Sequence, residues 1–203
     1  MHHLFLKGSN PAKPTLLLLH GTGGNEKDLL PLAELIDSEA SVLTVRGSIL
    51  ENGMPRFFRR LAEGVFDEED LIFRTHELNQ FIDEAAKTYA FDRGNVLAIG
   101  YSNGANIAAS LLFHLRHSLR GAILHHPMVP MRGIALPDLT GTPVFIAAGT
   151  NDPICSVNET NELQTLLESA HAETTLHWGH QGHMLTQVEA EAAASWYQAF
   201  VDK

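Results

Sequence analysis

The feature that most constrains the fold is a series of five short apolar runs, each bounded by turn residues. They cover residues 15–21, 41–45, 95–100, 121–126 and 143–149. Each run has the length of a strand and is almost wholly apolar, which is typical of strands covered on both faces of a sheet. Two weaker runs, 4–7 and 174–178, are more polar or alternate, so we expect them nearer the sheet edges. The pattern predicts about seven strands.

Amphipathic stretches separate these runs. Between Leu71 and Tyr89, apolar residues recur at helical spacing and form one stripe, and the same spacing recurs in 108–119, 163–167 and 188–200. Parallel strands need long crossovers, which helices supply. The sequence therefore predicts an α/β fold, with a mostly parallel central sheet and helices on both faces. The 203 residues contain no linker-like tract, so we expect one domain over 1–203 without a cap domain.

Segment 46–70 does not follow this scheme. It has no clear hydrophobic period and follows the second strong strand. Long irregular loops in compact domains are usually functional. We expect a long loop near the functional site; the alternative is a solvated surface excursion.

Charge and cysteine content exclude several classes of function. Lys and Arg number 14 against 24 Asp and Glu, for a formal charge of −10, which disfavours binding to nucleic acids or to anionic lipid surfaces. The longest strictly aliphatic run, 16–19, is far too short to span a membrane. The N-terminus lacks the features of a secretory signal. Cys155 is the only cysteine, which suits a reducing cytoplasm.

The stretch GYSNG at 100–104 matches the G-x-S-x-G pattern of a nucleophile elbow. An apolar strand precedes Ser102 and an apolar-striped helix follows it, which is the context that such an elbow requires. The turn is so tight that a Cβ at Gly100 or Gly104 would collide with the neighbouring strand or helix. Ser102 is therefore the predicted nucleophile.

A serine nucleophile needs a base, and the base needs an acid that holds its tautomer. Asp152 follows the buried run 143–149, and His183 lies between the last strand and the last helix, in the order Ser, Asp, His of α/β-hydrolases. Asp138 is a weaker candidate for the acid because it precedes its strand. His180 is the closest rival to His183, which we prefer because Gly182 allows a tight turn directly before it.

The stretch HGTGG at 20–24 is the predicted oxyanion loop. Its glycines allow a sharp turn after the first strong strand, so that the amide of Thr22 can pair with the amide of Asn103 around an oxyanion. A phosphate-binding loop is the alternative, but the G-K-[ST] ending and the G-x-G-x-x-G spacing are both absent.

A metal site and a cysteine nucleophile have less support. The histidines at 125, 126, 177, 180 and 183 lack the spacing of known zinc signatures. Cys155 lies away from the elbow and is expected to fill space as a small apolar residue. We expect neither a cofactor nor a metal.

These motifs, in this order and spacing, resemble the phospholipase/carboxylesterase family of α/β-hydrolases, which includes acyl-protein thioesterases. The resemblance covers nearly the whole chain, and segment 45–71 is similar to MhqD-type hydrolases, a branch associated with quinone and hydroquinone resistance. It implies a cytoplasmic, cofactor-free serine esterase, often a homodimer, with catalytic roles on Ser102, Asp152 and His183 and oxyanion roles on Thr22 and Asn103. The thioesterases usually carry Gln where this chain has Asn103, which counts against thioesterase specificity.

We therefore expect a carboxylesterase that acts on small soluble esters. Its pocket is predicted to include Phe57, Phe58 and Met128. The arginines of 46–70 either attract a substrate carboxylate or pair with nearby acids, and we expect the pairing (Arg56, Arg59 and Arg60 with Glu63, Asp67 and Glu68). The alternatives are a thioesterase or lysophospholipase, an amidase, or a non-catalytic binding protein on the same fold.

Overall fold

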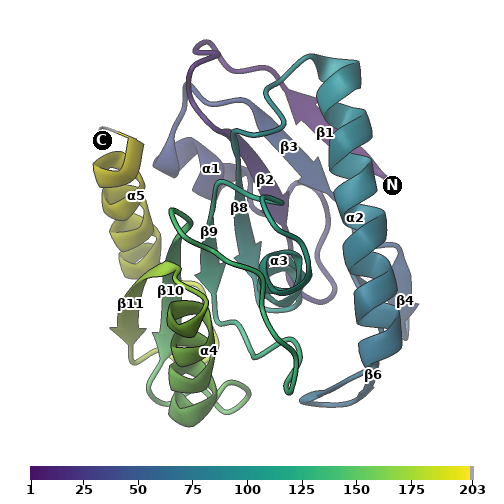
Figure 1. Ribbon diagram of the computed structural model, residues 1–203, viewed down its shortest axis with the longest axis vertical. Coiled ribbons are helices and arrows are strands. Elements are labelled where there is room, and N and C mark those ends of the chain that lie inside the picture. Colours follow the sequence, from purple (N-terminus) through teal and green to yellow (C-terminus); the bar gives the residue numbers. More distant parts are fainter. Residues whose placement is uncertain (202–203) are drawn as a thin grey trace.

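The computed structural model describes residues 1–201 and contains a central seven-stranded sheet in the order β1-β3-β2-β8-β9-β10-β11 (Figure 1). Its edge strand β1 is antiparallel to β3, and the other neighbours are parallel. The predicted α/β class is confirmed, and the two weaker runs form the edge strands. The strands are β1 (His3–Leu6), β2 (Thr15–Leu19), β3 (Val42–Val45), β8 (Val96–Tyr101), β9 (Gly121–His125), β10 (Pro143–Gly149) and β11 (Glu173–Gly179).

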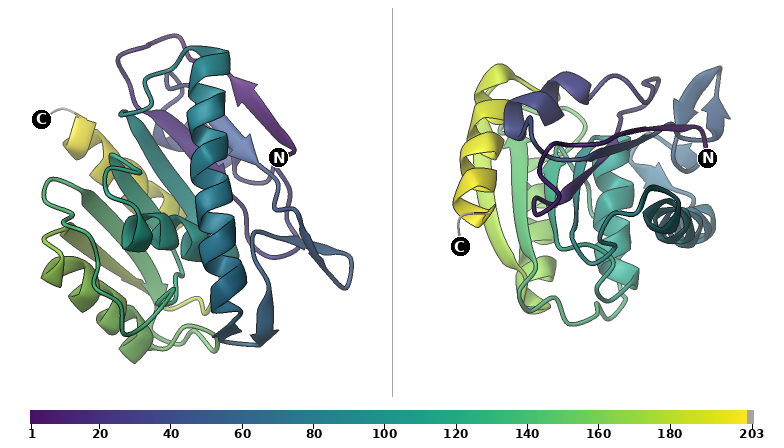
Figure 2. Two further views of the ribbon diagram at one scale, coloured as in Figure 1. Left: turned by 45° about the vertical axis from the view of Figure 1, so that its right-hand side comes forward. Right: turned by 90° about the horizontal axis from the view of Figure 1, so that it is seen from above.

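Helices cover both faces of the sheet (Figure 2). Leu16 and Leu18 of β2 pack in the cluster that contains α1 and α5, whereas Leu17 and Leu19 pack in the cluster that contains α2, α3 and α4. This alternation follows from the two-residue period of a strand. The helices are α1 (Leu30–Ile36), α2 (Glu68–Tyr89), α3 (Asn103–His114), α4 (Val157–Ser169) and α5 (Gln187–Val201).

Two helical expectations need correction. Helix α3 ends at His114, so the pattern over 108–119 was wrong at its end: Leu119 is buried beyond the helix and not on it. The periodicity also placed the start of α2 at Leu71. The helix begins at Glu68, because the side chain of Asp67 caps it by accepting a hydrogen bond from the amide of Asp70.

Segment 46–70 was expected to be a long irregular loop. This was wrong, because the segment contains two short hairpins. Strand β4 (Ile49–Glu51) pairs with β5 (Met54–Arg56), and β6 (Arg60–Ala62) pairs with β7 (Val65–Phe66). Asn52 and Gly53 join the first pair with φ values of 51° and 81°, and two positive φ values are typical of a type I′ turn. The Asn-Gly pair was therefore a hairpin signal that periodicity alone missed.

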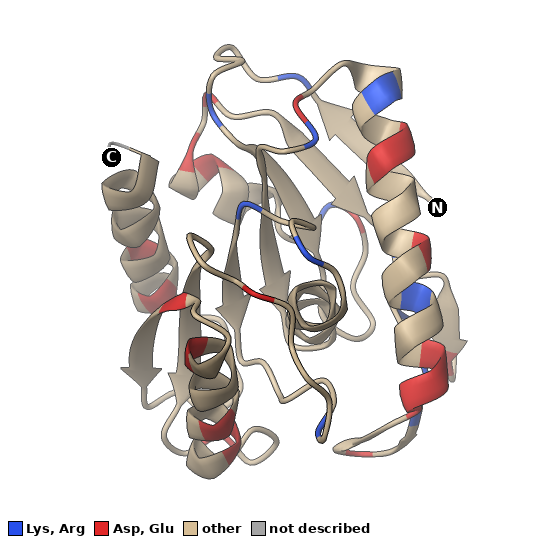
Figure 3. Cartoon of the chain, viewed as in Figure 1, with Lys and Arg blue, Asp and Glu red and all other residues tan. Residues whose placement is uncertain are grey.

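Acidic side chains are spread over α2, α4 and α5 (Figure 3). Within residues 1–201, no helix combines the length and the apolar character needed to cross a lipid bilayer.

Candidate active site

The site lies at the carboxyl ends of the parallel strands, where ligands bind in open α/β sheets. Strand β8 ends at Tyr101 and α3 begins at Asn103, so Ser102 forms the whole connection. Its φ of 51° and ψ of −112° lie in a region that L-residues rarely adopt, at a cost of about 1–3 kcal/mol. A Cβ at Gly104 would overlap the backbone of Leu19, and a Cβ at Gly100 would lie 2.6 Å from Ala105. Close packing of α3 on β2 and β8 therefore requires both glycines.

A hydrogen-bonded chain links Ser102 to His183 and Asp152, which follow the ends of β11 and β10. The hydroxyl oxygen of Ser102 lies 2.8 Å from Nε2 of His183, and Nδ1 of His183 lies 2.7 Å from Oδ2 of Asp152. The geometry is satisfied when Ser102 donates to Nε2 and Nδ1 donates to the carboxylate. The structure thus brings together the three residues that the sequence singled out.

Asp152 is fixed as a buried carboxylate. Its Oδ1 accepts hydrogen bonds from the amides of Ile154 at 2.8 Å and Cys155 at 3.0 Å. Burial alone would raise the pKa of Asp152, but the hydrogen bonds from Cys155, Ile154 and His183 outweigh it and hold the pKa below its ordinary value. The carboxylate is therefore charged near neutral pH and oriented toward His183.

The rival candidates lie elsewhere. The ring of His180 is exposed and its Nδ1 lies 2.6 Å from the hydroxyl of Thr150. Asp138 is exposed and accepts hydrogen bonds from the amide and hydroxyl of Thr140. Neither residue joins the hydrogen-bonded chain from Ser102.

The two expected oxyanion donors border the same cavity as Ser102 and His183. Asn103 is the first residue of α3, so its amide has no partner within the helix, and within residues 1–201 neither this amide nor that of Thr22 donates a hydrogen bond. The side chain of Asn103 points away, because its Oδ1 accepts the amide of Phe57 at 2.7 Å. An oxyanion is stabilised by such free amides, and both residues line the cavity that Ser102 lines.

The cavity around Ser102, here called the Ser102 cavity, has a volume of about 360 Å³. Met128 lines it, as expected. Phe57 and Phe58 do not: both are buried, with Phe57 against His20 and Phe58 edge-on to Phe66. The prediction that Phe57 and Phe58 line the pocket was therefore wrong, because both belong to the core. Phe66 lines the Ser102 cavity instead. The apolar wall comprises Phe66, Tyr101, Met128, Ile154 and Cys155.

Two arginines of segment 46–70 also reach the Ser102 cavity. Arg56 is buried, and its Nη1 donates to the hydroxyl of Thr22 at 2.9 Å. Arg56 and Arg60 both pair with Glu51, whereas Arg59 pairs with Asp67, as expected. Ion pairing was therefore the correct expectation for these arginines, although Glu51 was not among the predicted partners. Arg56 also ties the hairpin segment to the loop that carries Thr22.

Sequence reasoning missed three residues that hold the hydrogen-bonded residues Asp152 and His183 in place: Tyr101, His126 and Glu189. The hydroxyl of Tyr101 donates to the carbonyl oxygen of His183 at 2.6 Å. Buried His126 lies 3.0 Å from Oδ2 of Asp152 through Nδ1, and 3.2 Å from Oε2 of Glu189 through Nε2. His126 directly follows a strand end at this edge of the sheet, which was a usable signal, but it was weighed only as a zinc ligand.

His126, Asp152 and His183 form a polar cluster of the residue types that bind metals. The three ligand atoms lie within 4.8 Å of one another. Both Nδ1 atoms lie 2.7–3.0 Å from the same oxygen of Asp152, closer than the roughly 3.3 Å between ligands of a tetrahedral zinc with 2.0 Å bonds. The cluster is therefore built from hydrogen bonds between its members.

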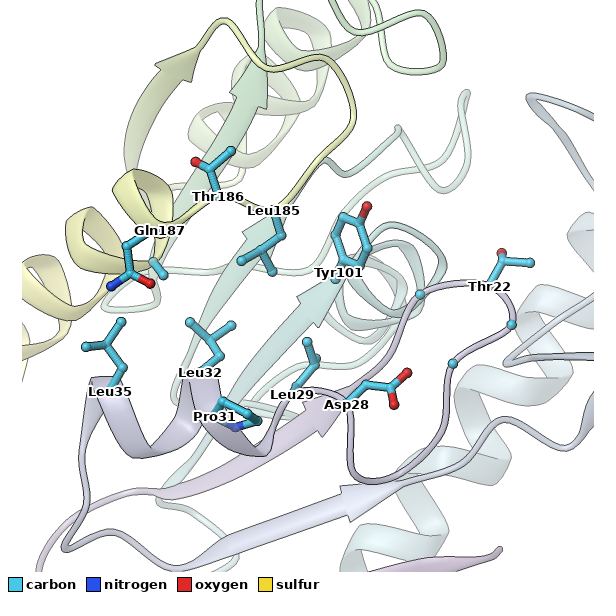
Figure 4. Close-up of a pocket in the computed structure, with 14 residues that line it drawn as sticks. Thr22, Asp28, Leu29, Pro31, Leu32, Leu35, Tyr101, Leu185, Thr186 and Gln187 are labelled. Atoms are coloured by element: carbon cyan, nitrogen blue, oxygen red, sulfur yellow. The ribbon is translucent and has the colours of Figure 1, made fainter.

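Figure 4 shows a second hollow, here called the α1–α5 groove. It has a volume of about 560 Å³ and runs between α1, the loop 21–24 and the start of α5. Thr22 and Tyr101 line both hollows. Its apolar surface comes mainly from Leu29, Leu32, Leu35 and Leu185.

Comparison with known proteins places this architecture in a family. The family model described as Phospholipase/Carboxylesterase matches residues 2–200. The chain is 61% identical over 198 residues, 98% of each chain, to the Bacillus subtilis (strain 168) protein named "Putative hydrolase MhqD". A Bacillus cereus carboxylesterase crystal structure matches at 70% identity and a TM-score of 0.96, covering 97% of this chain and 93% of that one. YahD, solved with malic acid, matches at 31% identity and a TM-score of 0.93, covering 98% of each chain. The chain belongs to the phospholipase/carboxylesterase family and has its α/β-hydrolase fold.

Proposed function

We propose that this hydrolase is a serine carboxylesterase that cleaves small soluble esters through an acyl-enzyme on Ser102. One observation carries the proposal: His183 lies 2.8 Å from the hydroxyl of Ser102 through Nε2 and 2.7 Å from Asp152 through Nδ1. A single imidazole can thus accept the serine proton while the buried carboxylate stabilises the resulting cation.

In the proposed reaction, Ser102 attacks the ester carbonyl as its proton passes to Nε2 of His183. The amides of Thr22 and Asn103 stabilise the oxyanion, each contributing about 3 kcal/mol in the transition state. His183 then protonates the leaving alcohol, and water, activated by the same imidazole, hydrolyses the acyl-enzyme. Both steps need one proton carrier, and His183 is the group in contact with Ser102.

The Ser102 cavity supports a small substrate. Its volume of about 360 Å³ lies at the lower end of the range of roughly 300–1,000 Å³ for sites that bind small molecules. Longer chains would have to extend into the α1–α5 groove or into solvent. We therefore expect short acyl esters to be the better substrates.

The test measures initial rates on p-nitrophenyl acetate, butyrate, octanoate and palmitate, with Ser102→Ala in parallel. We expect hydrolysis of the two short esters, weaker rates on the long ones, and a loss of at least about 10³-fold in Ser102→Ala. Equal turnover by the variant would remove Ser102 from the mechanism. No turnover by the folded wild type would favour a binding protein. Faster hydrolysis of palmitate than of acetate would contradict the small-substrate proposal.

A second comparison distinguishes an esterase from a thioesterase by varying the leaving atom. Phenyl butyrate and S-phenyl thiobutyrate present the same acyl group with an oxygen or a sulfur leaving atom. A higher kcat/KM on the oxygen ester supports the carboxylesterase proposal. A clear preference for the thioester would support the thioesterase alternative.

We also propose that the enzyme acts in the cytoplasm without a cofactor. Support for the compartment comes from Cys155, which is the only cysteine of the sequence and a free thiol in the structure. The homodimer and the link to quinone resistance that the family resemblance implies stay predictions.

A further inference from the structure

His126 is a buried histidine whose two ring nitrogens both face acceptors. It directly follows β9 and has a φ of 53°. Nδ1 lies 3.0 Å from Oδ2 of Asp152, and Nε2 lies 3.1 Å from the carbonyl oxygen of Met184 and 3.2 Å from Oε2 of Glu189. Its side chain is fully buried, and its ring centroid lies 5.1 Å from that of His183.

These partners define the protonation of the ring. Ionised carboxylates and carbonyl oxygens only accept hydrogen bonds, so each nitrogen of His126 must donate. A neutral ring would leave one nitrogen lone pair facing an oxygen lone pair at about 3 Å in a buried site. Burial lowers the pKa of His126, but the hydrogen bonds and charges of Glu189 and Asp152 outweigh it and raise the pKa above its ordinary value.

The neighbouring side chains of His125, Tyr101 and Cys155 are neutral at pH 7 and supply no compensating charge. Burial lowers the pKa of His125, 3.9 Å from Glu189, to about 4, so this ring is neutral at pH 7. Burial raises the pKa of Tyr101, and that of the Cys155 thiol, which donates to the carbonyl oxygen of His126. The pKa of Glu189 stays low despite burial, because of its hydrogen bond from His126. On the cavity side, the charged groups are Arg56, Arg60 and Glu63.

We propose that His126 is held as an imidazolium between Asp152 and Glu189, and that this buried positive charge keeps His183 neutral and ready to accept the Ser102 proton. His126 is thus a positioning residue that acts through Asp152, and the inference rests on the proposed function. With two carboxylates and one imidazolium, the cluster has a charge of −1 at rest and becomes neutral when His183 takes the proton. Without the charge on His126, two buried carboxylates would favour His183 in its protonated form, which is inactive as a base.

The first test requires no esterase activity. Protein with ¹⁵N-labelled histidine is studied by NMR across a pH series, with the His126 ring assigned through bonds in the wild type and by its absence in His126→Asn. Asn tolerates positive φ better than most residues. We expect both ring nitrogens of His126 to be protonated at pH 7.5, about one unit above the ordinary histidine pKa. A ring with one protonated nitrogen at that pH would overturn the proposal, whether or not the variant folds.

The same NMR series follows His183. Coulomb's law at 5.1 Å and an effective dielectric constant of about 20 gives an upper bound on the order of 2 units for the effect of the lost charge. We expect the pKa of His183 to rise by at least about 1 unit in His126→Asn. An unchanged or lower value would contradict the proposal.

The kinetic counterpart is the acid limb of kcat/KM on p-nitrophenyl acetate. Its midpoint is expected to move to higher pH by at least about 1 unit in His126→Asn. His180→Asn is the matched control, because His180 lies in the same loop as His183 but contacts Thr150, and its midpoint should not move. A lower kcat with an unchanged midpoint in His126→Asn would indicate a purely structural role and refute the inference. Absence of esterase activity in the wild type would instead refute the proposed function, while the NMR result would still decide the charge of His126.

Discussion

Replacing Ser102 by Gly should stabilise the protein relative to Ser102→Ala, although both variants lack the nucleophile. The φ of 51° and ψ of −112° at this position are close to those of the first central residue of a type II′ turn, where glycine is preferred. Both substitutions remove the hydroxyl and its hydrogen bond to His183. The difference between them therefore isolates the backbone strain at the elbow.

The magnitude follows from two opposing terms. An L-residue in such a region costs about 1–3 kcal/mol, and glycine relieves this cost. Glycine also adds unfolded-chain entropy, which lowers stability by about 0.4–1 kcal/mol. With the middle of each range, about 2 and about 0.7 kcal/mol, Ser102→Gly is expected to be about 1.3 kcal/mol more stable than Ser102→Ala. For a chain of this size, about 1 kcal/mol corresponds to roughly 2–4 °C in Tm.

Thermal unfolding and urea denaturation of both variants measure this difference. Ser195, on the exposed face of α5, is the matched control because its backbone is helical. There Ser→Gly should be less stable than Ser→Ala by about 1 kcal/mol, the opposite sign. If Ser102→Gly melts at or below the temperature of Ser102→Ala, the serine is not strained and the elbow argument fails.

The remaining predictions concern the base, the elbow packing, pH and metals. His183→Ala should lose ester hydrolysis and His180→Ala should keep most of it, measured as kcat/KM; the reverse would reassign the base. Gly104→Ala should lower the free energy of unfolding, measured by urea denaturation, by more than about 3 kcal/mol, because its Cβ would overlap the backbone of β2. Gly53→Ala should lower it by about 1 kcal/mol, because Gly53 has open space around it but a φ of 81°. Equal losses in the two variants would refute the packing argument. Glu189 has a lowered pKa, so its contribution to stability is present above about pH 4.5 and is lost as the pH falls through its folded pKa. In Glu189→Gln, the free energy of unfolding should therefore decrease less steeply as the pH is lowered in the acid range. An unchanged slope of the free energy of unfolding against pH would contradict this prediction. Chelators should leave the esterase rate unchanged, whereas inhibition that zinc reverses would support a metal site.

Much of the fold could be predicted because hydrophobic periodicity is local. The seven strand segments and most helices were visible from runs and stripes of apolar residues. Segment 46–70 was not, because its hairpins are short and depend on turn residues such as Asn52 and Gly53, whose positive φ leaves no hydrophobic pattern. The end of α3 was missed for a related reason: Leu119 belongs to the same core cluster as the helix stripe, although the helix ends at His114.

Some residues of the candidate site could likewise be predicted from the sequence, and others could not. Ser102, Asp152 and His183 could be named in advance because each follows a recognisable strand, and the carboxyl ends of parallel strands meet at one edge. The orientation of Phe57 and Phe58 could not be predicted, because they lie in the short connection between the two hairpins, where no strand or helix period indicates which side chain points into the core. The structure places both in the core and gives the wall position to Phe66.

The sequence by itself determined the order of strands and helices, the strained serine turn and the places from which an acid and a base could reach it. Only the tertiary structure decided that His183 and not His180 lies against Ser102, and that His126 sits between Asp152 and Glu189. The physical reason is the distance along the sequence over which each interaction acts. Backbone propensity and hydrophobic pattern act over a few residues, whereas a proton transfer or a buried charge pair depends on distances of about 3 Å between side chains that lie 26 to 81 positions apart.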